Sequence, residues 1–492
     1  MTSELPTIQI KNTLTGDKEP LRPVEPGRVK MYACGVTTYD YCHVGHALQA
    51  VFFDIIRKYL RYAGYEVVYV RNHTDVDDKI IQRAAERGMS PDALAEQMVR
   101  AAEEDLALIG VEPADHEPRV SESIPQIIAM VEELIENGYA YATDDGDVYY
   151  RVRSKKDYGK LSGRKIEELR TGTRDLVAGA KEFELDFALW KADETEGASW
   201  DSPWGKGRPG WHIECSAMAK EFLGDTFDIH GGGRDLVFPH HENEIAQSEA
   251  ANGAAFANIW IHNGLVTIDK QKMSKSLGNH LLIRDAVKKW PHEVLRLSII
   301  SQHYGSNVDF SEEGFQTFFL RLNYYYSTLA ALDEAGQNAP DRAEPIEGFE
   351  PDGVRAAFHA AMCDDFNTAA ALAELNTAMR KANEFLGQKH DKARKRYTAR
   401  ELGTALREIG GVLGLLEADA AETIDKLRDH LLPILGVTRE EIDTAIADRA
   451  AAREAKDYAK SDEIRDALAA RGIELMDGRE GTGWRVRPQP AS

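Results

Sequence analysis

Cysteine is scarce in this chain of 492 residues, which has four: Cys34, Cys42, Cys215 and Cys363. Secreted domains held together by disulfides carry many more for their length. The scarcity excludes a disulfide scaffold and predicts a reducing compartment, for which the cytoplasm is the simplest choice. Each cysteine is then a candidate for core packing or for metal binding.

Long apolar runs are missing as well. No N-terminal stretch combines a basic start with an apolar core, and no run approaches the roughly 20 residues that a membrane-spanning helix needs. The sequence therefore predicts no contact with a membrane. A single hydrophobic core is not expected at 492 residues, and the length favours about three domains.

Basic residues are in deficit, because 60 Lys and Arg stand against 82 Asp and Glu, a net charge of −22. Non-specific nucleic-acid binding rests on neutralising phosphates, so the composition argues against it. Two local runs are exceptions: residues 151–165 hold seven Lys and Arg against one acid, and residues 380–400 hold eight against two. Each run is either a surface for nucleic acid or an ordinary solvated face, and the sequence leaves both open.

Residues 28–70 have the pattern of a β-α-β unit. Residues 28–34 are rich in apolar side chains and residues 66–70 in β-branched ones, and both runs are typical of buried strands. Between them, apolar residues recur at helical spacing before Gly64: Leu48, Val51, Phe52, Ile55, Ile56, Tyr59 and Leu60.

A first short motif, His43-Val44-Gly45-His46, lies between the first predicted strand and the helix that follows it. Helix N-termini attract anions through their free N–H groups and the macrodipole. Gly45 lets a nucleotide approach the backbone, and His43 and His46 can donate to phosphate oxygens. The alternative interpretation is two surface histidines at a turn.

A second motif, Lys-Met-Ser-Lys-Ser at residues 272–276, follows two strand-like segments at 258–262 and 265–268. Two lysines and two hydroxyls on a loop suit a clamp on a triphosphate. Lys275 would meet the charge on the departing pyrophosphate, and Lys272 would support it. The alternative is an exposed lysine-rich turn.

In this order along the chain, the two motifs resemble the ATP-binding signatures of class I aminoacyl-tRNA synthetases. The resemblance implies an α/β fold with a Rossmann-type parallel-sheet catalytic domain that holds ATP with Mg²⁺. Residues 211–218, 231–235 and 239–247, together with the segments around both motifs, are similar to the cysteinyl-tRNA synthetase family over almost the whole chain.

In that family the ligands of one zinc ion per chain fall at positions that match Cys34, Cys215, His240 and Glu244. By spacing alone the set is weak, because 181 positions separate the two cysteines. The resemblance implies that this zinc binds the substrate thiolate. A thiolate is a far better zinc ligand than the hydroxyl of serine, and a methyl group cannot bind at all, so discrimination needs no editing site.

The resemblance implies further site positions. Thr74 matches a substrate-contacting position, whereas the family usually has an apolar residue where His73 stands. Trp211 is either a wall of the amino-acid pocket or an ordinary core aromatic. The expected ATP-binding residues are the following: Gly45, Gly231, Gly232, Gly233, Asp235 and Lys275.

The C-terminal segment resembles the family's anticodon-binding domain. It has a helix-like run at 442–470, a turn at 477–478 and a strand near 484. Arg453, Asp462, Asp477 and Trp484 match positions that contact anticodon bases. Arginine can bind a guanine edge, aspartate can accept from a cytosine amino group, and tryptophan offers a stacking face. The alternative for Trp484 is that it fills the core of its own small domain.

The expected domains follow from these segments: the first half of the catalytic domain at 1–130, a connective insertion at 131–200, the second half with the metal and the Lys-Met-Ser-Lys-Ser loop at 201–285, a stem-contact region at 286–335, a turn-rich linker at 334–353, an α-helical bundle at 354–435 and the anticodon-binding domain at 438–492.

The resemblance implies ATP-dependent attachment of L-cysteine to its cognate tRNA through cysteinyl-adenylate, by a monomer. One alternative is a related enzyme that joins cysteine to an amino-sugar, but such enzymes lack a tail like residues 438–492. Another is a non-catalytic RNA-binding protein derived from a synthetase. Such a protein is expected to lose the phosphate-binding residues, which are all kept here: His43, His46, Lys272 and Lys275.

Overall fold

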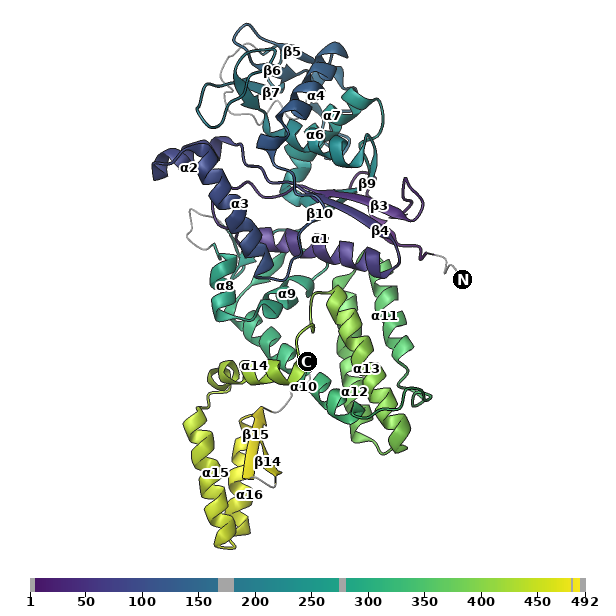
Figure 1. Cartoon of the computed structure of the whole chain (residues 1–492), viewed down its shortest axis with the longest axis vertical. Helices are drawn as coiled ribbons and strands as arrows, with labels where there is room; N and C mark the ends of the chain where they lie inside the picture. The colour runs from purple at the N-terminus through teal and green to yellow at the C-terminus, as the bar shows by residue number, and fades with distance from the viewer. Residues whose placement is uncertain (1–4, 167–180, 274–279, 479–480, 487–492) are drawn as a thin grey trace. The chain divides into compact units, whose positions relative to one another are not determined.

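The computed structural model describes residues 5–166, 181–273, 280–478 and 481–486, and the chain forms two compact units (Figure 1). The first unit consists of Met1–His292, Gln302–Asp309 and Met362–Thr368. The second consists of Glu293–Ser301, Phe310–Ala361 and Ala369–Ser492. Among the described residues, no helix combines the length and the apolar character needed to cross a membrane.

A four-stranded parallel sheet with strand order β10-β9-β3-β4 forms the centre of the first unit. Its strands come from two distant stretches of sequence: β3 (Arg28–Ala33), β4 (Glu66–Arg71), β9 (Phe227–Gly233) and β10 (Ala257–Asn263). Figure 1 shows α1 (Val44–Tyr62) on one face and α6 (Trp211–Leu223) and α7 (Glu242–Asn252) on the other. Because helices cover both faces, the four strands are buried along most of their length. The expected α/β fold with a parallel sheet is confirmed.

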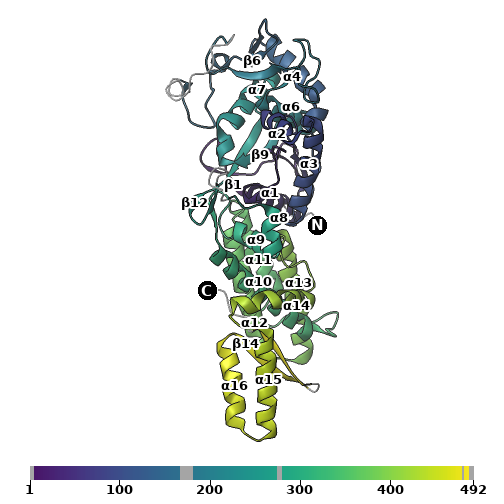
Figure 2. The same ribbon diagram turned by 90° about the vertical axis from the view of Figure 1, so that its left-hand side faces the viewer.

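The remaining elements of this unit surround the sheet. A second, antiparallel sheet with order β5-β6-β7-β8 spans residues 140–209, and α4 and β6 lie near each other in both views (Figures 1 and 2). The elements are β1 (Gln9–Lys11), β2 (Lys18–Pro20), α2 (Asp78–Arg87), α3 (Pro91–Ala107), η1 (Val120–Glu122), α4 (Ile124–Glu136), β5 (Ala140–Ala142), β6 (Val148–Tyr150), η2 (Val152–Ser154), β7 (Phe187–Ala192), β8 (Gly207–Pro209), η3 (Arg234–Leu236), η4 (Val237–His241), β11 (Val266–Ile268), β12 (Gln271–Lys272), α8 (Ile283–Lys289) and β13 (Val308–Phe310).

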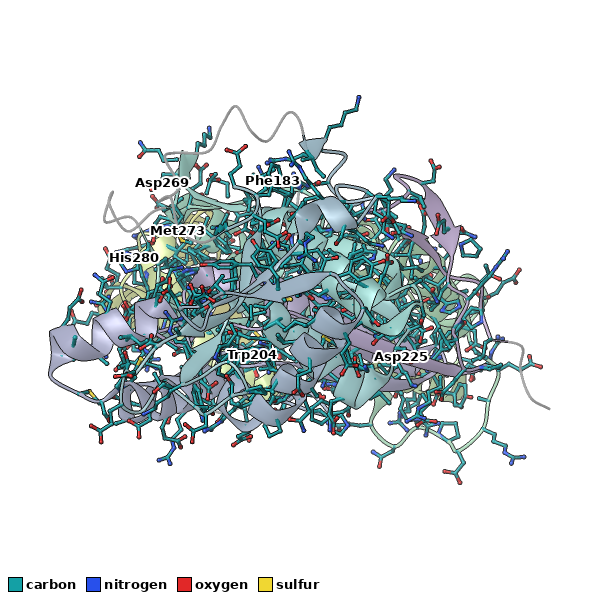
Figure 3. All side chains as sticks on the ribbon, turned by 90° about the horizontal axis from the view of Figure 1, so that it is seen from above. Phe183, Trp204, Asp225, Asp269, Met273 and His280 are labelled. Atoms are coloured by element: carbon teal, nitrogen blue, oxygen red, sulfur yellow. The ribbon has the colours of Figure 1, made fainter. Side chains whose placement is uncertain are left out.

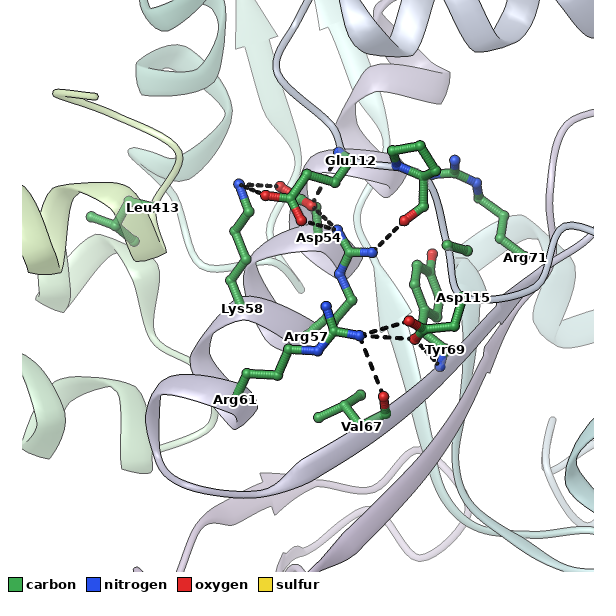
Figure 4. Close-up of polar contacts among 12 residues, drawn as sticks. Asp54, Arg57, Lys58, Arg61, Val67, Tyr69, Arg71, Glu112, Asp115 and Leu413 are labelled. Carbon is green, nitrogen blue, oxygen red and sulfur yellow. Dashed lines mark hydrogen bonds and ion pairs between the residues drawn. The ribbon is translucent and has the colours of Figure 1, made fainter. Parts of the chain in front are cut away.

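Charged side chains of α1, two of them buried, form ion pairs with the segment that follows α3 (Figure 4). Arg57 Nη2 lies 2.7 Å from Asp54 Oδ1 and 3.2 Å from Glu112 Oε2. The side chains of Arg57 and Asp54 are 2% and 1% exposed. Lys58 also pairs with both acids. Charges this deeply buried are tolerated only when paired, so the cluster fixes the position of α1.

The second unit is mainly helical: α9 (His292–Ile300), α10 (Glu312–Gly336), α11 (Pro351–Cys363), α12 (Thr368–Gly387), α13 (Lys392–Val412), α14 (Ala420–Ile434), α15 (Arg439–Glu454), α16 (Tyr458–Ala470), β14 (Ile473–Gly478) and β15 (Gly481–Val486). The turn-rich linker is shorter than expected. Helix α10 continues to Gly336, and α11 begins at Pro351 with proline in its first turn, which that residue favours.

The helix-like run at 442–470 is two helices rather than one. Helices α15 and α16 lie side by side as a hairpin (Figure 2) and are joined by a turn in which Lys456 has φ of 61°. The Asp457 side chain accepts from the Lys460 N–H and starts the second helix. Helical apolar spacing continues on both sides of the turn, so periodicity alone did not reveal the break.

Candidate active site and metal centre

The first motif forms the N-terminus of α1. His43 is the N-cap, and its Nδ1 accepts from the Gly45 N–H at 3.1 Å, while Nδ1 of His46 accepts from the His43 N–H at 3.3 Å. The two rings stack with centroids 3.8 Å apart. Since Nδ1 of each ring accepts a hydrogen bond, a neutral ring carries its own proton on Nε2, where it is a donor.

Gly45 leaves no room for a side chain. A Cβ there would lie 2.9 Å from the His43 ring and 3.3 Å from Cε of Met273. The methionine of the second motif therefore lies against the N-terminus of α1. On the other side of the second motif, Leu281 O accepts from the Val44 N–H at 2.9 Å, and Leu282 forms a backbone bridge with His43.

The described residues that flank the second motif thus contact the first. Figure 3 shows Asp269, Met273 and His280 close together at one edge of the view. Lys272 ends β12, which pairs with β11. Lys275 lies outside the described residues.

A cavity of about 440 Å³ joins this helix terminus to the other predicted positions. Its lining includes, among the expected site residues, Cys34, His43, Gly45, His46, Thr74, Trp211, Cys215, Gly233, Asp235 and His240, together with Met273. These positions lie in or next to β3, α1, β4, α6, β9, η3, η4 and β12. The carboxyl ends of parallel strands meet at one edge of a sheet, which is where ligands of open α/β folds bind.

Four predicted metal ligands converge beside this cavity. One ligand atom from each of Cys34, Cys215, His240 and Glu244 lies within 4.8 Å of the others, and all four residues are buried. The two sulfurs are 3.7 Å apart, and His240 Nε2 is 2.9 Å from Glu244 Oε1. Tertiary structure therefore brings Cys34, just beyond β3, and Cys215 of α6 together despite their separation in sequence.

Helix α7, which carries Glu244, starts at Glu242, directly after a π-turn over Val237–His241. Phe238 is extended, with φ −141° and ψ 131°, as the residue before a proline tends to be. His240 and Glu244 still face each other, because the turn and the helix run on together.

Burial and direct contact shift the pKa values of all four groups. Burial raises the pKa of the Cys34 thiol, while the hydrogen bond from Cys34 lowers the pKa of Cys215 to about 6. Burial would lower the pKa of His240, but Glu244 raises it to about 10. Although burial opposes it, His230 and His240 hold the pKa of Glu244 well below its usual range. Charged thiolate and carboxylate groups packed this closely are suited to a cation such as zinc, which takes sulfur, nitrogen and oxygen ligands.

The sequence did not predict the histidines that lie behind these ligands. His230 Nε2 lies 2.7 Å from Glu244 Oε2, and His241 Nε2 lies 3.3 Å from Cys34 Sγ. His241 Nδ1 in turn contacts His262 Nε2 at 2.7 Å. Cys34, His230, His241 and Glu244 also lie within 4.8 Å of one another, so they are an alternative ligand set that shares two members with the first. The only signal in the sequence was the repetition of histidine on β9, β10 and the turn before α7.

Trp211 belongs to the pocket wall rather than to the core. Its side chain is 39% exposed, and its ring stacks on His240 with centroids 4.3 Å apart. Thr74 is buried, and its Oγ1 accepts from Asn72 Nδ2 at 3.3 Å.

The glycine segment divides into two parts. Gly233 and Asp235 line the cavity, whereas Gly231 and Gly232 are not among the lining residues. A Cβ on Gly231 would lie 2.2 Å from the Phe53 ring, and one on Gly232 would lie 2.9 Å from Leu236. Close packing of the sheet, rather than an open approach for a ligand, therefore requires glycine at 231 and 232.

The predicted anticodon residues lie on α15, α16 and the β14–β15 hairpin. Arg453 Nη1 is 3.1 Å from Asp477 Oδ2, and Arg449, which the sequence did not suggest, holds both oxygens of Asp477 at 2.7 and 3.0 Å. The hydrogen bonds from Arg449 keep the pKa of Asp477 well below its usual range. Asp462 pairs with Arg465 at 2.9 Å. Arg453, Asp462 and Asp477 are thus all exposed, and Arg453 and Asp477 contact each other.

Trp484 is half-buried beneath a cation. The Arg428 guanidinium lies 5.2 Å from the centre of its ring. Its strand partner across the hairpin is Leu475.

Family comparisons agree with this geometry. The family model described as "tRNA synthetases class I (C) catalytic domain" matches residues 20–318, the DALR domain matches 357–417, and the cysteinyl-tRNA ligase anticodon binding domain matches 437–485. The cysteine–tRNA ligase of Halorhodospira halophila is 50% identical over 97% of the chain and 99% of its own length, and that of Geobacter metallireducens is 47% identical over 98% and 100%. The chain belongs to the cysteine–tRNA ligase family.

Solved structures support the class I fold of this family member. Methionyl-tRNA synthetase of Mycobacterium tuberculosis, in complex with methionyl-adenylate, has a TM-score of 0.61 at 15% identity. The match covers 84% of the present chain and 95% of the chain of that structure. A putative arginyl-tRNA synthetase of Campylobacter jejuni has a TM-score of 0.54 at 13% identity and covers 80% and 94%. At such identities the likeness concerns the fold alone.

The basic run at 151–165 is only partly a free surface. Lys155 and Lys160 both pair with Glu249 of α7, at 2.8 and 2.6 Å, and Arg151 pairs with Glu182. Lys156 and Arg164 are exposed. Much of the positive charge in this run therefore balances acids of the same unit.

Proposed function

We propose that the protein attaches L-cysteine to tRNA at the expense of ATP, through a cysteinyl-adenylate. One observation carries the proposal: a single cavity is lined both by the histidines at the N-terminus of α1 and by Cys34, Cys215 and His240 of the buried cluster that Glu244 completes. Cysteine–tRNA ligases that match the chain over almost its whole length support the same activity.

Activation of cysteine requires a phosphate site and no side-chain nucleophile. The cysteine carboxylate attacks the α-phosphate of Mg²⁺-bound ATP in line, and pyrophosphate leaves. The Nε2–H groups of His43 and His46 and the N-terminus of α1 meet the developing charge on the phosphates. Lys272 and Lys275 stabilise the pyrophosphate, and Gly45, Gly233 and Asp235 are positioned on the cavity wall for the nucleotide.

The buried cluster of metal-ligating side chains would recognise cysteine. Cys34, Cys215, His240 and Glu244 would hold zinc, because two sulfurs, an imidazole and a carboxylate are the donors that zinc takes. A zinc ion held there supplies a Lewis-acid position that binds a thiolate in preference to a hydroxyl or a methyl group. Trp211, stacked on His240, and Thr74 then orient the rest of the amino acid within the cavity.

Transfer completes the reaction. A hydroxyl of the terminal adenosine of tRNA attacks the acyl carbon of the adenylate, and AMP leaves. Arg453, Asp462, Asp477 and Trp484 would contact the anticodon, since their side chains lie on the exposed surface of the C-terminal domain or at its edge. Arg449 would act indirectly by orienting Asp477.

Charging of a total tRNA pool with labelled cysteine and Mg-ATP tests the proposal. Label that is acid-precipitable and labile to base would support it. Cysteine-dependent pyrophosphate exchange without charged tRNA would instead indicate a ligase with another acceptor, such as an amino-sugar. The absence of both activities would favour a binding protein.

A further inference from the structure

A second cluster of metal-ligating side chains lies outside the site described above, near the end of β4. His73, Glu103 and Glu117 each offer one ligand atom, and these atoms lie within 4.8 Å of one another. They come from three parts of the first unit: the residues after β4, helix α3, and the segment between α3 and η1. Neither ATP binding nor cysteine recognition, as proposed, uses this cluster.

His73 is the buried member of the cluster. Its side chain is 2% exposed, and neither ring nitrogen has a hydrogen-bond partner among the described residues. Buried polar groups are almost always paired, so two unpaired nitrogens on one ring indicate a missing ligand. Burial lowers the pKa of His73 to about 4, which leaves the ring neutral with a lone pair to offer.

The distances around His73 suit an ion better than a hydrogen bond. Nε2 lies 3.9 Å from Oε1 of Glu103, which is too far for a hydrogen bond. An ion between them would lie about 2.0–2.2 Å from each atom, and the observed separation accommodates this. Burial and the nearby Glu117 raise the pKa of Glu103, because both disfavour its charged form. A bound cation would favour that charged form instead.

The charges leave room for a cation. Oε1 of Glu117 accepts from Arg71 and from the Ala114 N–H, whereas Oε2 has no partner in the part of the chain that is described. Arg119 and Arg100, which also lie near Glu103, both pair with Glu96, at 2.5 and 2.7 Å. Glu103 itself has no ion pair with a guanidinium in the described part of the chain.

We propose that His73, Glu103 and Glu117 form a second divalent-cation site, for an ion such as Zn²⁺ or Co²⁺ that accepts both imidazole and carboxylate ligands. The ion joins α3 to the residues that follow β4, directly before Thr74 of the cavity wall. This site stands independently of the proposed function.

Cobalt distinguishes the two centres in the full-length protein. Protein loaded with one equivalent of Zn²⁺, which the cluster with two cysteines takes first, is titrated with Co²⁺ and followed by visible absorption. We expect one further saturable equivalent whose spectrum lacks the thiolate charge-transfer band of a cysteine-ligated ion. The midpoint of thermal unfolding should rise with Co²⁺, because the ion binds the folded state.

Two variants and a matched control decide the outcome. Glu103→Gln, at an exposed position, should weaken Co²⁺ binding by about tenfold or more, and His73→Leu should abolish it along with the thermal shift. Glu104→Gln, the exposed neighbour outside the cluster, should bind like the unchanged protein. Equal uptake by all four proteins, or no uptake by the unchanged protein, would show that His73 is a packing residue only.

Discussion

At the scale of single residues, functional side chains are held by local contacts before any ligand arrives. Nδ1 of His43 and of His46 each accept a backbone N–H of the same helical turn, which leaves Nε2 as the donor. Donors fixed in advance cost no reorganisation when charge develops on a phosphate. Under the proposed function, the histidine pair would therefore stabilise a transition state more than it would strengthen ground-state binding.

The His46→Ala variant should separate these two roles. We expect kcat for cysteine-dependent pyrophosphate exchange to fall by about 10²–10³-fold, the usual effect of losing one such donor. Cysteine binding, followed by the fluorescence of Trp211 beside His240, should change little. His46→Gln keeps a donor and an acceptor and should restore part of the rate. Loss of cysteine binding in His46→Ala would instead make the residue a structural element of the pocket.

At the scale of elements, α1 depends on the buried cluster of Figure 4 for its position. Replacing Arg57 by Leu leaves Asp54 buried without its closest partner, and we expect a loss of about 3–5 kcal/mol in the free energy of unfolding. Arg61 on the same helix pairs with Asp115 at 2.9 Å, but both side chains are more than a third exposed.

Arg61→Leu is the matched control for that substitution, and it should cost less than about 1 kcal/mol because the pair is screened by solvent. Urea denaturation of both variants, followed by the circular dichroism of the helices, measures the difference. Equal losses would show that burial does not govern the contribution of these charges.

Helix α9 contains a carboxyl that should make stability depend on pH. Burial raises the pKa of Glu293, although Oε1 accepts from the Leu416 N–H at 2.6 Å and Oε2 from the Tyr326 hydroxyl at 2.9 Å. The folded state therefore holds this proton more tightly than the unfolded chain, whose glutamates have a pKa of about 4.3. The contribution is present at low pH and is lost as pH rises through the raised pKa.

Glu293→Gln removes that titration and keeps an acceptor for the same two donors. Between pH 4 and pH 8, the thermal midpoint of the unchanged protein should fall relative to that of the variant. The variant lacks the titrating carboxyl and so loses less stability as the pH rises. Comparing the two proteins cancels the other titrating groups. An unchanged pH profile would mean that Glu293 stays ionised in the folded state.

At the scale of the whole molecule, the acidic charge and the candidate tRNA surface must be reconciled. A net charge of −22 opposes binding of arbitrary nucleic acid, whereas the C-terminal domain presents Arg453 and Asp477 together on an exposed surface. Recognition by base edges rather than by phosphate neutralisation fits this distribution.

Arg453→Ala should therefore raise KM for tRNA in charging by about tenfold, which corresponds to one lost base contact. Pyrophosphate exchange, which needs no tRNA, should stay unchanged. Lys460→Ala removes one positive charge from an exposed position on α16 and should alter neither measurement. A similar rise of KM in both variants would mean that only charge matters there.

Local sequence determined the elements and much of the candidate site. The β-α-β unit around β3, α1 and β4, and the position of the first motif between strand and helix, are visible because strand and helix periodicity depend on neighbouring residues. Family resemblance added Cys34, Cys215, His240 and Glu244, which spacing alone did not connect.

Tertiary structure alone decided which distant groups meet. The histidines behind the metal cluster lie on β9, β10 and the turn before α7, and no pattern along the chain shows that their rings touch. The same holds for Arg449 beneath Asp477, for Lys155 against Glu249, and for the unpaired His73 beside Glu103. Sheet order and helix packing set these contacts, since they depend on the register between segments tens to hundreds of residues apart.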